Sequence, residues 1–259
     1  MIRIKDLCKS FENNNVLKNL NLEINDGEIV VILGKSGSGK SVLLKHIIGL
    51  LKPNSGSVFV DEHDMGKLCG RAYFKVLKSF GMIFQGGALF DSLSVGENIA
   101  FYLVEHKLCG GKFFPKSGIK KAVKDALKSV GLEGTEDLYP SSLSGGMKKR
   151  ASIARSVIYQ PKYTLYDEPT TGLDPVTAMT IGNLILEQHK RLNGTTVVVS
   201  HDIYTTINIA DRIALLENGI IQVIDSPKKF MSNDNQTIRS FNKIIGGNID
   251  NIVFNDRKI

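Results

Sequence analysis

The sequence predicts an α/β protein with a largely parallel β-sheet covered by helices, and three features support this prediction. A glycine-rich loop joins a strand-like run to an apolar helical segment near the N-terminus. The N-terminal segments 2–4 and 20–24 alternate apolar and polar residues, and together with the segment 58–60 they indicate an antiparallel sheet at one side. Short runs that are nearly all apolar, typical of strands buried on both faces, alternate with helical patterns along the chain: 29–33, 164–166, 196–199 and 213–216.

A helix is predicted over 119–130, because apolar residues recur there at the spacing of one helix face. These residues are Ile119, Ala122, Val123, Ala126, Leu127 and Val130. Lysines occupy the other face, which we interpret as solvated: Lys120, Lys121, Lys124 and Lys128.

The composition excludes several classes of protein. With 259 residues, 42% of them hydrophobic, the chain can form one large domain or one domain with an inserted subdomain. No apolar run approaches the ~20 residues that span a bilayer, and the N-terminus lacks the apolar segment of a secretory signal. Three cysteines without C-x-x-C spacing argue against a disulfide framework or a zinc site and favour a reducing cytoplasm. The net charge of +7 is compatible with nucleic acid, anionic lipid or a polyphosphate ligand.

The end of the chain differs from the rest, because Asn and Asp become frequent after Pro227. We interpret 231–259 as a C-terminal tail. Two alternatives remain open for it: disorder, or docking through Phe241, Ile244 and Ile245.

The glycine-rich loop has the pattern G-x-x-x-x-G-K-S between a predicted strand and a predicted helix that begins near Val42. Its residues are Gly34, Lys35, Ser36, Gly37, Ser38, Gly39, Lys40 and Ser41. Glycines let backbone N–H groups surround phosphate oxygens, and the following helix N-terminus favours an anion. Lys40 would reach the β- and γ-phosphates and the Ser41 hydroxyl would ligate Mg²⁺. The sequence therefore predicts a nucleoside-triphosphate site.

A second acidic element ends the predicted strand at 163–166. Asp167 suits the outer ligation of Mg²⁺, and the adjacent Glu168 can polarise a water that attacks the γ-phosphate. An Asp-Glu pair at the end of a strand is common by itself, so this interpretation depends on the phosphate loop.

Leu143 to Met147 distinguish this chain from GTPases and P-loop kinases, which share the elements above. Ser144, Gly145 and Gly146 open a helix and so offer a second set of backbone donors for a γ-phosphate. One subunit cannot easily aim two such sites at one phosphate, whereas a head-to-tail dimer can.

With these residues the chain resembles the ATP-binding-cassette (ABC) family, over about residues 1–227. Gly34 to Ser41 resemble its Walker A motif, Leu143 to Met147 its signature, and Asp167 with Glu168 its Walker B pair. The remaining matches are the Q-loop Gln85, the D-loop 171–174, the switch His201, and Phe11 at the adenine-stacking position. Met147 and Gly172 depart from the family's usual glutamine and alanine, but neither change removes a phosphate donor, a metal ligand or the base.

The resemblance implies a P-loop NTPase (RecA-like) core with an antiparallel β subdomain and an inserted helical subdomain. The ABC ATPase domain would span 1–230, with the helical subdomain at about 86–160. It also implies a homodimer that closes on two ATP molecules. The nucleotide would be bound by Phe11, Gly34 to Ser41, Val42 and Gln85. Lys40, Glu168 and His201 would be catalytic, and Ser41, Gln85 and Asp167 would hold Mg²⁺. A partner subunit would contribute Ser144, Gly145, Gly146 and Asp174.

An ABC ATPase without a membrane segment must act with other chains. Proteins of translation carry two cassettes and those of DNA repair contain a long coiled coil, and neither feature is present. A cofactor-assembly ATPase is a further alternative. We therefore predict the motor of a membrane transporter, and no motif indicates a nucleic-acid partner.

Two stretches, 84–99 and 139–150, resemble the ATPases of Mce/Mla-type lipid transporters, although Ser142 replaces an acidic residue common there. This resemblance implies a polytopic permease, an Mce-domain protein, often a STAS-domain partner, and a phospholipid or related lipid as cargo. The ATPase would lie peripherally at the cytoplasmic face of the inner membrane. The alternative is an importer of polar amino acids or other small solutes.

Overall fold

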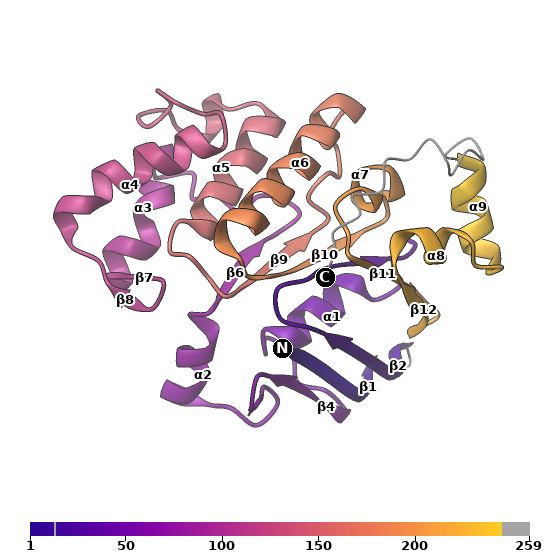
Figure 1. The fold of residues 1–259 in the computed structure, drawn as a ribbon. Helices are drawn as coiled ribbons and strands as arrows, with labels where there is room; N and C mark the ends of the chain where they lie inside the picture. Colours follow the sequence, from indigo (N-terminus) through magenta and orange to yellow (C-terminus); the bar gives the residue numbers. More distant parts are fainter. Residues whose placement is uncertain (13, 245–259) are drawn as a thin grey trace. The chain divides into compact units, whose positions relative to one another are not determined.

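The computed structural model describes residues 1–12 and 14–244 (Figure 1), and it divides into two compact units. Unit 1 comprises Met1–Leu77 together with the described chain from Thr195 onward, and unit 2 comprises Lys78–Gly194. Both units combine parallel strands with helices, so the predicted α/β fold class is confirmed. No helix within the described ranges is long and apolar enough to cross a membrane.

Unit 1 contains an antiparallel sheet in the order β2-β1-β4-β5, as the alternating N-terminal segments predict. Ile2 and Ile4 on β1 face Ile24 and Leu22 on β2, and all four side chains are buried. The apolar residues at alternate positions therefore form the packed face of this sheet. The strands are β1 (Ile2–Phe11), β2 (Asn14–Ile24), β4 (Ser55–Val60) and β5 (His63–Asp64).

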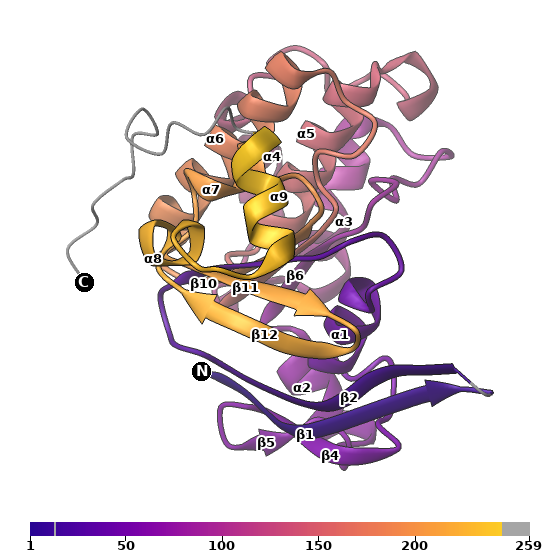
Figure 2. The same ribbon diagram turned by 90° about the vertical axis from the view of Figure 1, so that its right-hand side faces the viewer.

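The second group of strands in unit 1 has the order β12-β11-β3-β10. β3 pairs in parallel with both β10 and β11, so every residue from Ile29 to Leu33 is buried. β12 returns antiparallel along β11 and forms the edge of this group (Figure 2). The strands are β3 (Ile29–Leu33), β10 (Thr195–Ser200), β11 (Arg212–Glu217) and β12 (Ile220–Asp225).

Helices cover these strands in unit 1. The helix α1 packs against β10 and β4. The glycine-rich loop joins the end of β3 to the start of α1. The helices are α1 (Lys40–Ile47), α2 (Gly70–Leu77), α7 (Ile203–Ile207), α8 (Pro227–Met231) and α9 (Gln236–Ile244).

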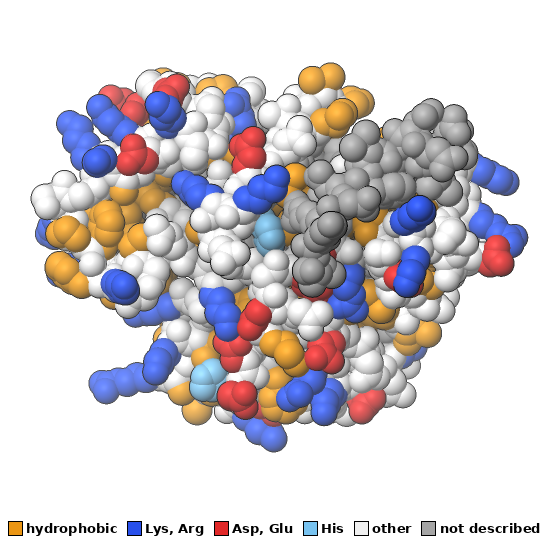
Figure 3. All heavy atoms as spheres, viewed as in Figure 1, with side chains coloured by type: hydrophobic (Ala, Val, Ile, Leu, Met, Phe, Trp, Pro, Cys, Tyr) orange, Lys and Arg blue, Asp and Glu red, His pale blue; other side chains and the backbone are white. Residues whose placement is uncertain are grey.

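Unit 2 consists of the parallel pair β6–β9 and a group of helices. The central helix α5 packs against α3, α4, α6 and β6. The predicted helix at 119–130 is α4, which begins earlier, at Lys116, and its predicted lysines are all exposed. Basic side chains are spread over the face of the molecule drawn in Figure 3. The elements are β6 (Phe80–Ile83), α3 (Val95–His106), β7 (Leu108–Cys109), β8 (Lys112–Phe113), α4 (Lys116–Ser129), α5 (Gly145–Val157), β9 (Tyr163–Asp167) and α6 (Pro175–Leu192).

The described part of the predicted tail, up to residue 244, forms the helix α9, which packs on α8. Ile238 is fully buried, whereas Phe241 is only half-buried. Thr237 Oγ1 donates to Glu217 Oε1 at 2.6 Å, and Asn242 Nδ2 donates to the Met231 carbonyl at 2.7 Å. Of the two alternatives for the tail, docking therefore holds for this part. Ile245 and the side chain of Ile244 lie outside the described residues.

We expect Ile238→Ala to release α9, because truncating a buried Ile typically costs about 2–5 kcal/mol. Hydrogen exchange should show faster exchange of the amides at 236–243 in this variant. Lys243→Ala, at an exposed position of the same helix, is the control and should exchange like the wild-type chain. Equal protection in both variants would mean that Ile238 does not anchor α9.

Candidate functional site

The phosphate loop, residues 34–39, connects β3 to α1 in unit 1. Lys40 is the first residue of α1, and its Nζ donates to the carbonyls of Gly34 at 2.7 Å and Lys35 at 3.0 Å. The ammonium is thus buried within the curve of its own loop. Gly39, the residue before the helix, has φ +101°, a left-handed conformation that favours glycine.

Position 34 requires a glycine, because the backbone of Leu216 lies close to it. A Cβ at this position would lie 2.5 Å from both the Leu216 carbonyl oxygen and Ser38 Oγ. We expect Gly34→Ala to displace the loop and to weaken both ATP binding and folding, since overpacking costs about 1–3 kcal/mol. At Gly66 a Cβ would meet nothing nearer than 3.4 Å, so Gly66→Ala is the control. Calorimetric titration and thermal unfolding test the pair, and wild-type values for both variants would contradict the prediction.

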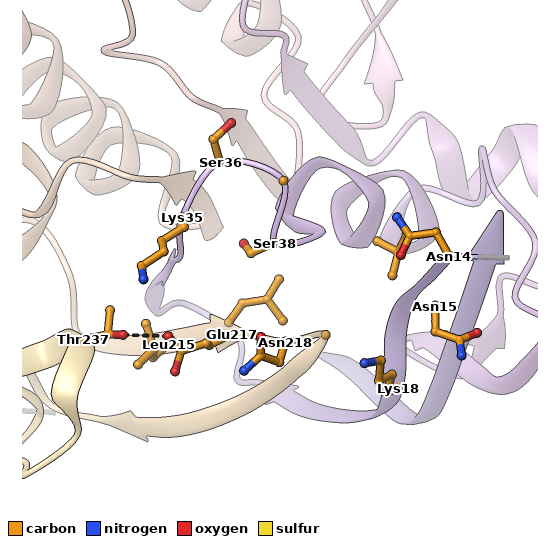
Figure 4. Close-up of a pocket in the computed structure, with 14 residues that line it drawn as sticks. Asn14, Asn15, Lys18, Lys35, Ser36, Ser38, Leu215, Glu217, Asn218 and Thr237 are labelled. Atoms are coloured by element: carbon orange, nitrogen blue, oxygen red, sulfur yellow. Dashed lines mark hydrogen bonds between the residues drawn. The ribbon is translucent and has the colours of Figure 1, made fainter.

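A cavity of about 400 Å³ lies beside the loop, between β2 and the turn that joins β11 to β12 (Figure 4). The side chains of Lys35 and Ser38 lie on the side of the loop that faces this turn, whereas Ser36 points away (Figure 4). Four of the predicted nucleotide-binding residues line the cavity: Lys35, Ser36, Gly37 and Ser38. The remaining predicted residues of unit 1 are not among its lining residues.

Phe11 and His201 are the other predicted site residues of unit 1. Phe11 ends β1 with 43% of its surface exposed, and the ammonium of Lys9 lies 5.2 Å from the centre of its ring. An exposed ring is suited to stacking on a planar base. His201 is exposed directly after β10, and Asp202 caps the following helix through the N–H group of Tyr204.

In unit 2, Asp167 ends β9 and Glu168 follows it, and both side chains are buried. Glu168 has φ +50°, a conformation that few residues other than glycine adopt. Thr171 contacts Glu168 twice: its N–H donates to the Glu168 carbonyl at 3.3 Å, and its Oγ1 donates to Oε2 at 3.1 Å. The Glu168 carboxylate is therefore held in one direction by the turn that follows it.

Ser144 caps the N-terminus of α5, because its Oγ accepts a hydrogen bond from the N–H of Met147 at 3.3 Å. Gly145 and Gly146 follow in the first turn, where backbone N–H groups have no partner within the helix. Ser144 and Gly145 are exposed, so the N–H groups of this helix start are accessible, and a helix N-terminus favours an anion.

Asp174 caps α6 by accepting from the N–H of Thr177 at 3.0 Å. Hydrogen bonds from the Thr177 side chain and backbone lower the pKa of this exposed carboxyl. Thr177 also approaches the signature, since a Cβ at Gly146 would lie 2.9 Å from its Cγ2. The structure thus brings Ser144 to Gly146 and Asp174 to neighbouring helix starts within one subunit.

Lys149 is a residue of the site that the sequence interpretation did not single out. Its Nζ donates to the Gln85 carbonyl and, at 3.5 Å, to the Glu168 carbonyl. Burial lowers the pKa of Lys149, and the carboxylates of Asp167 and Glu168 oppose this shift. The side chain of Gln85 itself is exposed. The sequence carries little signal for Lys149, because it is the second of three consecutive basic residues and its burial is seen only in the structure.

The predicted site residues are thus divided between the two units. Unit 1 carries Phe11, the phosphate loop with Lys40, Ser41 and Val42, and His201; unit 2 carries Gln85, Ser144 to Gly146, Asp167, Glu168 and Asp174.

Ser41, Gln85 and Asp167, the predicted metal ligands, offer only oxygen donors: a hydroxyl, an amide carbonyl and a carboxylate. Mg²⁺ prefers oxygen ligands and is usually held by one or two carboxylates together with substrate phosphates. Among the described residues no three His, Cys, Asp or Glu side chains gather as a metal site. The donor set therefore fits an ion that is held jointly with a nucleotide.

Comparisons with known proteins identify the family. The profile of the ABC transporter family matches residues 17–171. The probable ribonucleotide transport ATP-binding protein Mkl of Mycobacterium leprae is 35% identical over 93% of this chain and 68% of its own length. The intermembrane phospholipid transport system ATP-binding protein MlaF of Haemophilus influenzae is 40% identical over 82% of this chain and 78% of its own. The methionine import ATP-binding protein MetN of Geobacillus kaustophilus is 42% identical over 85% of this chain and 64% of its own.

A solved structure agrees with this result. The ATP-binding cassette MJ0796, determined as a dimer bound to ADP and Pi in a post-hydrolysis state, has a TM-score of 0.79 and 31% identity. The match covers 88% of this chain and 99% of that one. The resemblance to ABC proteins, including those of Mla-type systems, is therefore confirmed, and this chain belongs to the ABC transporter family as an ATP-binding subunit that hydrolyses ATP.

Proposed function

We propose that this chain powers a transporter of phospholipid or a related lipid in the bacterial envelope. The observation that carries the proposal is its similarity to MlaF, a phospholipid-transport ATPase by its name, over most of both chains. The stretches 84–99 and 139–150, the second of which contains Met147, support the same interpretation. The first stretch is rich in apolar and small residues, which suits the docking of a helix from another chain.

The partners in this proposal are a second copy of the ATPase, a polytopic permease, an Mce-domain protein and a STAS-domain protein. The ATPase would lie at the cytoplasmic face of the inner membrane, attached through the permease. The ABC ATPase domain would span 1–230, with the helical subdomain at about 86–160 and a tail at 231–259.

ATP would bind with its adenine stacked on Phe11 and its phosphates surrounded by the loop from Gly34 to Ser41, with Val42 in the helix that follows. Lys40 would leave the loop carbonyls that it now contacts and pair with the β- and γ-phosphates. Ser41, Gln85 and Asp167 would hold Mg²⁺, which when bound offsets charge on the phosphate oxygens.

In hydrolysis, Glu168 would orient the attacking water and accept its proton, and His201 would hold the γ-phosphate and this water. The partner subunit would supply Ser144, Gly145 and Gly146 as donors to the γ-phosphate, and Asp174 would couple the two subunits. Positioning and electrostatic stabilisation supply most of the catalysis in phosphoryl transfer. Loss of the γ-phosphate would remove the contact between the subunits and open the dimer.

A second candidate is the ATPase of a small-solute importer, such as one for amino acids. The specific observation in its favour is the 42% identity with MetN, a methionine-import ATPase by its name. In that case the transported compound would be a polar solute, and the proposed chemistry of the site would be unchanged.

Purification of the chain with its native membrane partners separates the two candidates. The lipid-transport proposal predicts that a polytopic permease and an Mce-domain protein co-purify, and that organic extraction releases bound phospholipid or a related lipid. A complex that instead contains a periplasmic solute-binding protein and carries amino acids without lipid would overturn it. The Lys40→Ala chain is purified in the same way as a control. Partners that are lost with this variant are those whose assembly with the chain needs bound nucleotide.

A further inference from the structure

We propose that Lys149 is a positioning residue that fixes Gln85 and Glu168 through their backbone carbonyls and thereby sets the rate of ATP hydrolysis. This inference rests on the proposed role of Glu168 as the base. It adds a residue from the signature helix to the machinery of its own subunit, independently of the donors that the signature would offer to the partner's nucleotide.

The position of Lys149 is the first observation. It lies in the first half of α5, the helix that Ser144 caps, and only 7% of its surface is exposed. Its ammonium donates to the Gln85 carbonyl and to the Glu168 carbonyl. One side chain therefore joins the signature helix, the turn after β6 and the turn after β9, all within unit 2.

The conformation of Glu168 is the second observation. Its φ of +50° is unfavourable for a residue with a side chain, so the surrounding contacts must maintain it. The Glu168 carbonyl accepts from Lys149 and from the N–H of Thr171, and the Thr171 hydroxyl holds the carboxylate. Since the direction of the carboxylate follows from this backbone conformation, losing one of the donors would let the base turn away from its water.

The chemistry of the Lys149 side chain fits this role. A buried ammonium loses hydration, so it is retained only where polar partners compensate. Its three N–H donors can bond two carbonyls at once. The neighbouring Lys148 is half-buried, and within the described ranges its side chain has no hydrogen-bond partner. The two lysines thus differ in their contacts although they share one helix.

Steady-state ATPase kinetics of the intact chain test the proposal, with Lys149→Met as the main variant and Lys148→Met as the matched control. We expect Lys149→Met to lower kcat about 10- to 100-fold, the scale of a misplaced catalytic group. The KM for ATP should stay within about threefold of the wild-type value, because the hydrogen bonds of Lys149 go to the backbone carbonyls of Gln85 and Glu168 and leave the Gln85 side chain in place. Lys149→Gln, which keeps a shorter and neutral donor, should fall between the wild-type chain and Lys149→Met. Lys148→Met should keep the wild-type kcat.

Thermal unfolding of each variant shows whether it folds. If Lys149→Met does not fold, Lys149→Gln decides: a reduced kcat with an unchanged KM supports the proposal, and the wild-type kcat overturns it. The proposal is also overturned if Lys149→Met folds and retains the wild-type kcat, or if Lys148→Met loses as much activity. Glu168→Gln is measured in parallel, because an active Glu168→Gln chain would refute the proposed base itself. If Glu168→Gln is inactive and Lys149→Met is fully active, only the role of Lys149 is refuted.

Discussion

We expect the Glu168→Gln chain to hydrolyse ATP about 10²- to 10⁴-fold more slowly than the wild-type chain, the usual contribution of a general base. Glutamine has nearly the same shape as glutamate, and its amide oxygen can still accept from the Thr171 hydroxyl. The amide cannot accept a proton from the attacking water, however. ATP should therefore still bind, and phosphate release under saturating ATP measures the loss.

Glu187→Gln is the matched control, because Glu187 is an exposed glutamate on α6 of the same unit. It should hydrolyse ATP at the wild-type rate. Near-wild-type activity of Glu168→Gln would remove Glu168 from the role of base. The buried position and the positive φ of Glu168 would then need another explanation.

The Lys40→Ala chain should lose most of its affinity for ATP. A hydrogen bond to a charged group contributes about 1.5–3 kcal/mol, so losing the ammonium should raise the Kd for ATP at least about 10-fold. The loop would also lose the donor to the Gly34 and Lys35 carbonyls, which makes its conformation less defined before binding.

Calorimetric titration with ATP and Mg²⁺ measures this effect. Lys45→Ala, an exposed lysine on the same helix, is the control and should bind ATP like the wild-type chain. An unchanged Kd for Lys40→Ala would exclude Lys40 from the phosphate site.

The sequence was sufficient to predict the features that depend on local spacing. The apolar run 29–33 is β3, and the loop that follows it does connect a strand to a helix. The alternating segments at the N-terminus do pair as antiparallel strands. In each case the pattern of side chains along a short segment determines which face is buried, so the structure follows from neighbouring residues.

Other features depend on contacts between segments that are far apart in the sequence. Lys149 and Gln85 are separated by 64 positions. In the sequence, Lys149 is therefore just one member of the basic run 148–150. The positive φ of Glu168 and its contact with Thr171 depend on a turn that the residue types in this segment do not predict. Among the described residues of α9, Ile238 is fully buried and Phe241 is half-buried, because the position of this helix beside α8 decides which side chains are covered.

Two copies of this chain should complete each other's ATP sites, and the mass of the Glu168→Gln chain in solution tests this most directly. This variant should bind ATP without consuming it. Light scattering should therefore give twice the chain mass of 28.5 kDa with ATP and Mg²⁺, and the single-chain mass without nucleotide. Adding Gly145→Asp to Glu168→Gln should abolish the dimer, because a carboxylate at the start of α5 would repel the γ-phosphate. A Glu168→Gln chain that stays monomeric with saturating ATP, or a dimer that survives Gly145→Asp, would contradict the account.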